Sequence, residues 1–200
     1  MSAAGSVGAP VLRRARRRLF FGLWPDESCC AELAAAMRSA DVTGPGHAGR
    51  AVPLPDWHVT LCFLGAVEER LLPALHAGAA AVQLPAFELR FGRLRCWAEA
   101  GVVAALADCP PEAAALAAAL RSICLELGLS PDEKPLRPHI TLVRGLRGQS
   151  WHGAREATLN LRLAAREFCL AESQEGIQAP AVRYRTLARW PLLARGTARG

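Results

Sequence analysis

The stretch WHVTLCFLG, residues 57–65, places a histidine and a threonine two positions apart inside an otherwise apolar run. The stretch PHITLVRG, residues 138–145, repeats the order histidine, apolar residue, threonine, leucine. Alternate residues of a strand point to the same side, so each histidine shares a face with its threonine. We therefore expect two half-buried strands, each with one His/Thr pair on one face. On the opposite, core face we expect Val59, Leu61, Phe63, Ile140 and Leu142.

The two motifs lie 139 − 58 = 81 positions apart, and each ends at a glycine after a proline-containing approach. A single His-x-Thr is most often a packed histidine beside a strand-forming threonine. Two copies with the same apolar neighbours instead indicate an internal duplication, with two lobes that offer their pairs to a shared cleft. Two facing imidazoles can act as general acid and general base near neutral pH. With two hydroxyls to hold phosphate oxygens, the set favours in-line transfer at a phosphodiester without a metal.

The remaining patterns predict alternating helices and strands around a loop over residues 43–55. Apolar periodicity and start signals predict three helices, over residues 25–40, 68–83 and 110–128. Besides the motif strands, which begin at His58 and His139, strands are expected over residues 18–24, 86–97, 101–109, 166–173 and 181–193. Because these strands look half-buried and hairpin-like, the fold class is predicted as α+β with antiparallel sheets rather than a doubly wound parallel sheet.

Composition and charge limit the classes of ligand and compartment. Two hundred residues suit one domain, and the net charge of +6 comes almost wholly from arginine, since Lys134 is the only lysine. Arginine binds phosphate in a bidentate manner, so the excess of arginine favours an anionic ligand such as RNA. A GC-rich genome, which encodes basic positions as arginine, explains the same excess equally well. The seven cysteines form no CxxC pair, and no apolar run is long enough to cross a bilayer. We expect reduced cysteines and a cytoplasmic protein that does not bind membranes.

The domain boundaries follow from where the apolar pattern begins and ends. Residues 1–18, which include RRARRR, are predicted to be a flexible basic arm. Residues 19–193 are predicted to form one bilobal domain, and residues 194–200 a tail. Three histidines outside the motifs, His47, His76 and His152, are interpreted as surface or incidental residues.

The quoted motifs resemble the twin motifs of the two-histidine (2H) phosphoesterases. More narrowly, the chain resembles the RNA 2′,3′-cyclic phosphodiesterases of bacteria and archaea, also called 2′-5′ RNA ligases. The likeness runs from about Arg18 to Leu193 and includes RLFFGLWPDE, GRLRCWAEAGVVAAL, the RPH before the second motif, and VRYRTLARWPL. The resemblance implies a bilobal α+β fold with pseudo-two-fold symmetry, catalytic pairs in a central cleft, and no metal or other cofactor.

Carried over position by position, the resemblance implies that His58 is the proton donor and His139 the proton acceptor. Thr60 and Thr141 would hold the phosphate. Arg144 matches a basic residue that often follows the second motif in this family. Strict alternation places Arg144 on the face opposite His139, so it reaches the cleft only if the strand bends or ends near Val143, as the glycine at position 145 permits.

Other parts of the family pattern are weaker. An aromatic residue early in the chain, Phe20 or Phe21, is a candidate for stacking on a base, although both could equally be core residues. The arginine arm does not belong to the family pattern. FCLAES, residues 168–173, is a loose match to a more aromatic strand.

The predicted reaction is hydrolysis of an RNA 2′,3′-cyclic phosphate to a 2′-phosphate, with weak reverse 2′-5′ ligation. No Gly-rich phosphate loop with lysine is present, and the reaction needs no ATP, because the cyclic ester holds the energy. One alternative is a cyclic phosphodiesterase acting on a small nucleotide such as a cyclic phosphate of ADP-ribose. Another is a non-catalytic nucleotide- or RNA-binding module. The protein is expected to be a monomer.

Overall fold

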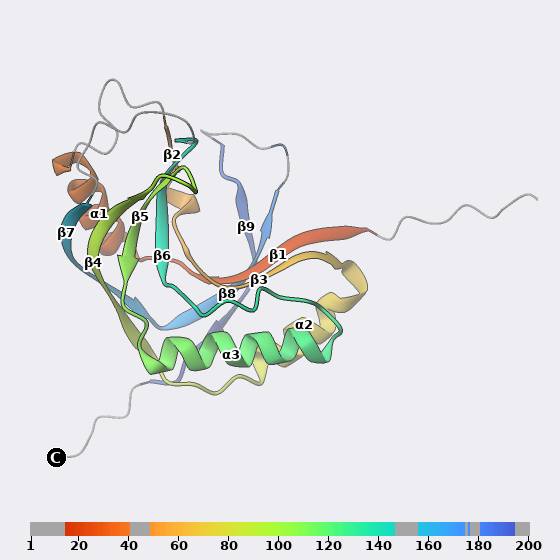
Figure 1. The fold of residues 1–200 in the computed structure, drawn as a ribbon. Helices are drawn as coiled ribbons and strands as arrows, with labels where there is room; N and C mark the ends of the chain where they lie inside the picture. The colour runs from red at the N-terminus through yellow and green to blue at the C-terminus, as the bar shows by residue number, and fades with distance from the viewer. Residues whose placement is uncertain (1–14, 41–48, 147–155, 175, 177–180, 195–200) are drawn as a thin grey trace, which may run out of the picture.

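The computed structural model describes residues 15–40, 49–146, 156–174, 176 and 181–194 (Figure 1). Within them the strands form one antiparallel sheet in the order β7-β4-β5-β6-β3-β1-β8-β9, with β2 paired to β6. The strands are β1 (Arg16–Leu23), β2 (Arg50–Ala51), β3 (Val59–Glu68), β4 (Phe87–Trp97), β5 (Val102–Ala107), β6 (His139–Arg144), β7 (Glu156–Ala165), β8 (Glu167–Ser173) and β9 (Tyr184–Pro191). The helices are α1 (Glu27–Ser39), α2 (Leu72–Ala80) and α3 (Pro111–Glu126), with short 3-10 turns at Leu54–Asp56 and Glu69–Leu71. The predicted α+β class with antiparallel strands is confirmed.

The sheet consists of two halves, called lobes below, that meet at one residue pair. Strands β7, β4, β5 and β6 form the first lobe and strands β3, β1, β8 and β9 the second. The described register gives β3 and β6 a single paired position, Val59 opposite Ile140. These two residues are themselves 140 − 59 = 81 positions apart, the spacing of the motifs. The pseudo-two-fold axis therefore passes through this pair, with one motif strand on each side.

Each long helix begins where the sequence provides a start signal. The carboxylate of Asp26 accepts a hydrogen bond from the backbone N–H of Cys29 at 2.9 Å and so caps α1, while α3 begins with a proline pair. Helix α1 packs against β7 of the other lobe and α3 against β3 of the other lobe, while α2 packs against α3 (Figure 1). These crossed contacts fasten the two lobes together. None of the helices in the described ranges is long and apolar enough to cross a membrane.

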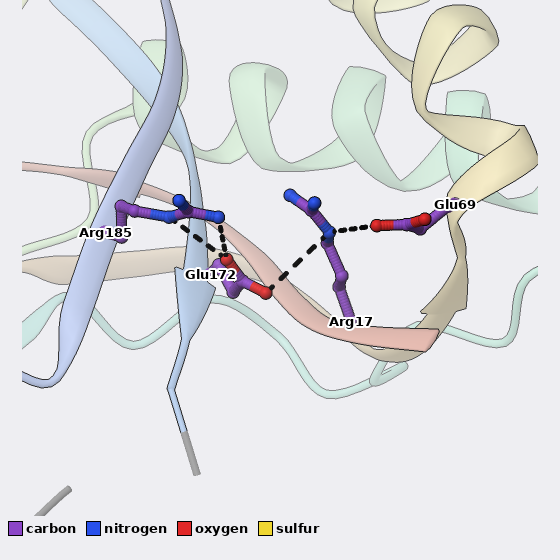
Figure 2. A network of polar contacts seen from close by, with 4 residues as sticks. All are labelled: Arg17, Glu69, Glu172 and Arg185. Carbon is purple, nitrogen blue, oxygen red and sulfur yellow. Dashed lines mark hydrogen bonds and ion pairs between the residues drawn. The ribbon is translucent and has the colours of Figure 1, made fainter. Parts of the chain in front are cut away.

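The N-terminal strand begins earlier than the sequence analysis predicted. Arg16, Arg17 and Arg18 pair with β3 as part of β1, so the basic arm cannot extend to residue 18. Figure 2 shows the reason: the Nε of Arg17 lies 2.7 Å from the Oε1 of Glu69, on the turn after β3, and 3.9 Å from the Oε1 of Glu172 on β8. Arg185 of β9 approaches the other oxygen of Glu172 at 2.7 Å. Residues 1–14 and 195–200, the rest of the arm and the tail, lie outside the described residues.

Three further elements differ from the expected boundaries. Strand β3 continues past Gly65 to Glu68, because β1 extends far enough to pair with it. Residues 50 and 51, expected in a loop, form the short strand β2 beside the end of β6. Strand β7 was not predicted at all, although its apolar residues recur at every second position: Leu159, Leu161 and Leu163 are buried. That alternation was the available signal.

Candidate active site

The strand register brings the two His/Thr pairs together on one face. Val59 and Ile140 are fully buried, so the residues on either side of them face away from the core. Continuing the antiparallel register by one residue in each direction places Thr60 opposite His139 and His58 opposite Thr141. Thr60, His58, His139 and Thr141 are all half-buried. Each histidine thus lies beside the threonine of the other motif, which the sequence alone did not predict.

Both catalytic candidates are held by the same kind of hydrogen bond. The Nδ1 of His58 lies 2.7 Å from the carbonyl oxygen of Asp56, and the Nδ1 of His139 lies 2.7 Å from the carbonyl oxygen of Arg137. A carbonyl can only accept, so in each imidazole the Nδ1 carries the hydrogen and donates it. The Nε2 is therefore the nitrogen that takes up a proton when the ring is neutral and releases it when the ring is protonated. The two histidines are equivalent in this respect.

Each motif is followed by a β-bulge that changes the alternation. Along β3, Phe21 of β1 pairs with Cys62 and Gly22 with Thr60, which leaves Leu61 without a partner in the pairing. The same happens 81 positions later in β6, where the pairing with β5 leaves Leu142 without a partner. An extra residue in a strand reverses the side to which the following residues point. The residues five positions after each histidine therefore point toward the cleft.

Those residues are Phe63 in the first motif and Arg144 in the second. Arg144 accordingly lines a cavity of about 230 Å³ together with His58 and Thr60. The bulge is thus the bend that the sequence analysis required for Arg144 to reach the cleft. The prediction that Phe63 faces the core was wrong for the same reason, because it lines this cavity too. The guanidinium of Arg18 lies 4.7 Å from the centre of the Phe63 ring.

Aromatic rings enclose His58 on several sides. Its ring is 4.8 Å from that of Phe20, 5.3 Å from that of Trp24 in a stacked arrangement, and 4.6 Å from that of Tyr184, which meets it edge to face. Phe20 is only 2% exposed and lies beneath the histidine. Phe21 points to the other side of β1, where it packs in the core against Phe168 and Trp190, so it does not reach the cleft.

His139 has a more open surrounding, with the Trp97 ring edge to face at 5.0 Å. Sequence reasoning missed Trp24, Trp97 and Tyr184 as neighbours of the histidines. Trp24 comes an even number of positions after Phe20, just past the end of β1. In an extended chain this spacing places both rings on the same side, so the sequence contained a signal for Trp24. Tyr184 comes from the last strand of the sheet, and no local pattern connects it to either motif.

The pKa of His58 is lowered from the ordinary 6.5 to about 4, chiefly by burial of the imidazole, and the positive charges of Arg144 and His139 act in the same direction. The hydrogen bond to the Asp56 carbonyl acts in the opposite direction. His58 is therefore neutral at pH 7 when the site is empty. An anion bound beside Arg144 would offset that charge and favour the protonated imidazole.

In an NMR titration of the ligand-free protein, we expect His58 to titrate well below pH 6. The variant Arg144→Met should move its pKa upward, because one positive charge is removed. The unfolded state binds this proton with a pKa of about 6.5, so the contribution of His58 to stability is complete above pH 6.5 and is lost as the pH falls toward 4. An apparent pKa near 6.5 in the wild-type protein would contradict this picture of a buried imidazole.

A buried carboxylate fixes the segment that precedes the first motif. Asp56 is 4% exposed, and its two oxygens accept hydrogen bonds at 3.0 Å from the backbone N–H groups of Arg183 and Tyr184. Its carbonyl is the group that holds the Nδ1 of His58. Asp56 therefore fixes both His58 and the start of β9, which carries one of the rings around His58. This residue was not selected from the sequence.

We expect Asp56→Ala to lower the free energy of unfolding by about 2–4 kcal/mol, because two backbone N–H groups lose a charged, buried acceptor. Denaturant unfolding monitored by tryptophan fluorescence measures this change. Asp26→Ala is a suitable comparison, since it removes a carboxylate that caps the exposed start of a helix, worth about 1 kcal/mol. Equal losses in the two variants would show that Asp56 is an ordinary cap.

Three neighbouring cavities, which share lining residues, surround this site. The largest, about 930 Å³, is lined by Thr60, Phe63 and His139 and extends over the β4–β5 hairpin and residues 134–137. The cavity beside His58 shares Thr60 and Phe63 with it. A third, about 290 Å³, adjoins the His58 cavity at Arg144, Arg183 and Tyr184. Thr141 lies on the correct face of β6 but lines none of these three cavities.

The described residues contain no group of three or more His, Cys, Asp or Glu side chains placed to hold a metal ion. The seven cysteines are free thiols, five of them buried. Among the other histidines, His76 packs edge to face on Trp190, 5.4 Å away, far from the motifs in the sheet. His47 and His152 lie outside the described residues.

A family model, that of the 2′-5′ RNA ligase superfamily, matches residues 25–176. The chain belongs to the 2′-5′ RNA ligase superfamily. The matched segment contains both motifs and the three helices, and it ends before β9 begins. Membership in the superfamily agrees with the resemblance read from the motifs.

Two curated relatives and one solved structure show how far the likeness to this superfamily extends. The chain is 33% identical over 155 residues to the RNA 2′,3′-cyclic phosphodiesterase of Escherichia coli, an alignment that covers 74% of this chain and 82% of that protein. It is 32% identical over 145 residues to the RNA 2′,3′-cyclic phosphodiesterase of Geobacillus stearothermophilus, covering 69% of this chain and 46% of that one. The crystal structure of E. coli LigT with 3′-AMP superposes with a TM-score of 0.76 at 28% identity, covering 89% of this chain and 99% of that chain.

Proposed function

We propose that this protein hydrolyses RNA 2′,3′-cyclic phosphate ends to 2′-phosphates, with His58 as proton donor and His139 as proton acceptor. The observation that carries the proposal is the matched pair of Nδ1–H···O=C bonds, which makes the Nε2 of both histidines the reactive nitrogen. The names of the two curated relatives support the same reaction.

In the proposed reaction a water molecule attacks phosphorus while the bond between phosphorus and the 3′ oxygen breaks. The Nε2 of His139 takes a proton from the water, and the Nε2–H of His58 gives a proton to the leaving 3′ oxygen. His58 must therefore become protonated as substrate binds, and the negative charge of the phosphodiester favours this protonation. After the product leaves, a proton exchanged with solvent restores the starting states.

The hydroxyls of Thr60 and Thr141 donate hydrogen bonds to the non-bridging oxygens, and Arg144 offsets the charge that builds up on them. No step requires a metal or another cofactor. With an RNA 5′-hydroxyl in place of water, the same groups in the same roles perform weak 2′-5′ ligation: the 5′ oxygen loses its proton to His139 and attacks phosphorus, while the bond to the 3′ oxygen breaks and His58 protonates that oxygen. Phe20 lies beneath His58 at 2% exposure, so we propose that it supports the histidine and does not stack on a base.

The test is incubation with adenosine 2′,3′-cyclic phosphate and with a cyclic-ended oligonucleotide in the presence of EDTA, followed by identification of the phosphomonoester. We expect the 2′-phosphate to form at a rate that EDTA does not change. Formation of a 3′-phosphate would mean that the bond between phosphorus and the 2′ oxygen breaks, and it would contradict the proposed direction of cleavage. Loss of turnover on chelation, restored by zinc or manganese, would contradict the metal-free mechanism.

The second candidate function is cleavage of a cyclic phosphate on a small nucleotide such as an ADP-ribose derivative. The aromatic rings around His58 favour this possibility, because a nucleotide base can stack on them even when no RNA chain is attached to the nucleotide. A direct comparison of turnover on that compound and on the oligonucleotide distinguishes the two. A non-catalytic binding module is the third alternative, and it predicts binding without product.

A further inference from the structure

Among the described residues, two groups of cationic side chains differ in their partners. In the first group arginines pair with glutamates close to them: Arg70 with Glu68, Arg90 with Glu88, and Arg189 with Glu167. Figure 2 shows the same arrangement around Glu172. Paired cations of this kind contribute little to binding, since their charge is already offset.

Within the part of the chain that the structure describes, the cations that line the large cavity beside His139 have no carboxylate partner. The side chains of Arg95, Lys134 and Arg137 make no hydrogen bond or ion pair with any described residue, and all three are exposed. Glu99 and Asp132 also line the cavity. Together with Arg121, the cationic side chains of the lining outnumber these two carboxylates, so the cavity carries an excess of positive charge. Unpaired cations around a concave surface attract a polyanion.

Two walls of this cavity are held in place. On one side the β4–β5 hairpin carries Arg95 and Trp97, whose ring contacts His139. On the other side Arg121 of α3 donates from its two terminal nitrogens to the carbonyls of Glu133 and Lys134, at 3.3 and 3.0 Å. These bonds fix the segment that leads into β6. The cavity is thus formed before any ligand arrives, and its volume of about 930 Å³ suits a nucleotide-sized ligand.

We infer that this cavity binds the RNA chain upstream of the reacting end, with its phosphates against Arg95 and Lys134 and a base against the Trp97 ring. The inference rests on the proposed function and deepens it, because it makes an oligonucleotide, not a mononucleotide, the preferred substrate. Base stacking on an aromatic ring and phosphate contacts to unpaired cations are the usual means of holding single-stranded RNA.

The test compares kcat/KM for adenosine 2′,3′-cyclic phosphate and for a tetranucleotide that ends in the same cyclic phosphate. We expect the wild-type protein to prefer the tetranucleotide, and the double variant Arg95→Ala/Lys134→Ala to lower that preference about tenfold. The preference should also fall as salt is added. Arg90→Ala, on the same strand as Arg95 but paired with Glu88, is the matched control and should leave the preference unchanged.

A binding measurement separates this inference from the reaction itself. Fluorescence anisotropy with a labelled tetranucleotide that ends in a 2′-phosphate needs no turnover, and the double variant should weaken its binding about tenfold. If neither cyclic substrate is turned over but this loss of binding occurs, the proposed reaction fails and the RNA site stands. Equal kcat/KM for both substrates in the wild-type protein, or unweakened binding in the double variant, would overturn the inference.

A second inference rests on the bulges and not on the cavity. The position equivalent to Arg144 in the first lobe is Phe63, which has no charge. The guanidinium of Arg18 lies over that ring at 4.7 Å and lines the same cavity as His58 and Arg144. Arg16 and Arg17, its neighbours on β1, each have a glutamate within 4 Å, whereas Arg18 has none among the described residues.

The geometry points to Arg18 as a second cation that contacts the phosphate, from the side opposite Arg144. Calorimetric titration with adenosine 2′-monophosphate tests this without turnover. We expect Arg18→Met, which keeps the aliphatic stem over Phe63, to raise the Kd about tenfold, and Arg18→Lys to restore part of the affinity. Arg16→Met is the control on the same strand. An unchanged Kd in a folded Arg18→Met protein, or an Arg18→Lys protein that binds no better than Arg18→Met, would reduce Arg18 to a packing residue.

Discussion

Replacing either His58 or His139 with alanine is expected to lower kcat by at least about a hundredfold, the usual contribution of a positioned acid or base. Each Nε2 has a separate task in the proposed reaction, so neither histidine can substitute for the other. The half-buried imidazoles each make one hydrogen bond to a backbone carbonyl, and their other contacts are with aromatic rings that keep their own places in the fold. Both variants should therefore fold, as circular dichroism and thermal unfolding can check.

His76→Ala is the control for this prediction. Its ring contacts Trp190 on β9 and takes no part in the cleft, so its loss should lower stability slightly and leave kcat unchanged. The role of a motif histidine would be structural if its alanine variant unfolds or retains full turnover. Because the two histidines act as a unit in one proton-transfer step, the double variant should be little slower than either single variant.

The second large effect is expected at the two hydroxyls. Thr60→Val and Thr141→Val keep the β-branched shape that favours a strand and delete one donor each. A lost hydrogen bond to a charged oxygen costs about 1–3 kcal/mol of transition-state stabilisation, which corresponds to roughly 5- to 150-fold in kcat/KM. Steady-state kinetics on the cyclic substrate measures the loss, while the free energy of unfolding should hold or rise slightly.

The two valine variants need not lose equal amounts. Thr60 lines both the His58 cavity and the large cavity, whereas Thr141 lines neither of them, so the larger loss is expected at Thr60. Thr158→Val, on the exposed face of β7 at the edge of the sheet, is the matched control. Unchanged kinetics in Thr60→Val and Thr141→Val would reduce both threonines to strand formers.

Local sequence pattern determined a large part of this fold. The alternation in β4 and the start signals of α1 and α3 are properties of short segments, and the structure has these elements close to where they were predicted. The pairing of histidine and threonine on one face also follows from the two-residue period of a strand. The repeat of 81 residues indicated the symmetric partner of each motif.

Other predictions failed because the deciding contact is distant in the sequence. Phe63 was expected in the core and lies in the cleft, since a bulge against β1 reverses the alternation after Leu61. The arm was expected to reach residue 18, but β3 and Glu69 hold Arg16 and Arg17 in the sheet. A bulge or a strand boundary is set by the partner strand, which no local window contains.

The sequence by itself determined which side chains carry the proposed chemistry: two histidines and two threonines in strands that repeat one another. Only the tertiary structure decided their mutual placement, because the single pair of Val59 with Ile140 is a contact between residues 81 positions apart. The same is true of Arg144, which a bulge turns into the cleft, and of the Asp56 carboxylate, which holds the start of β9. Periodicity fixes the face on which a side chain lies, whereas register and bulges, which depend on long-range pairing, fix what it meets there.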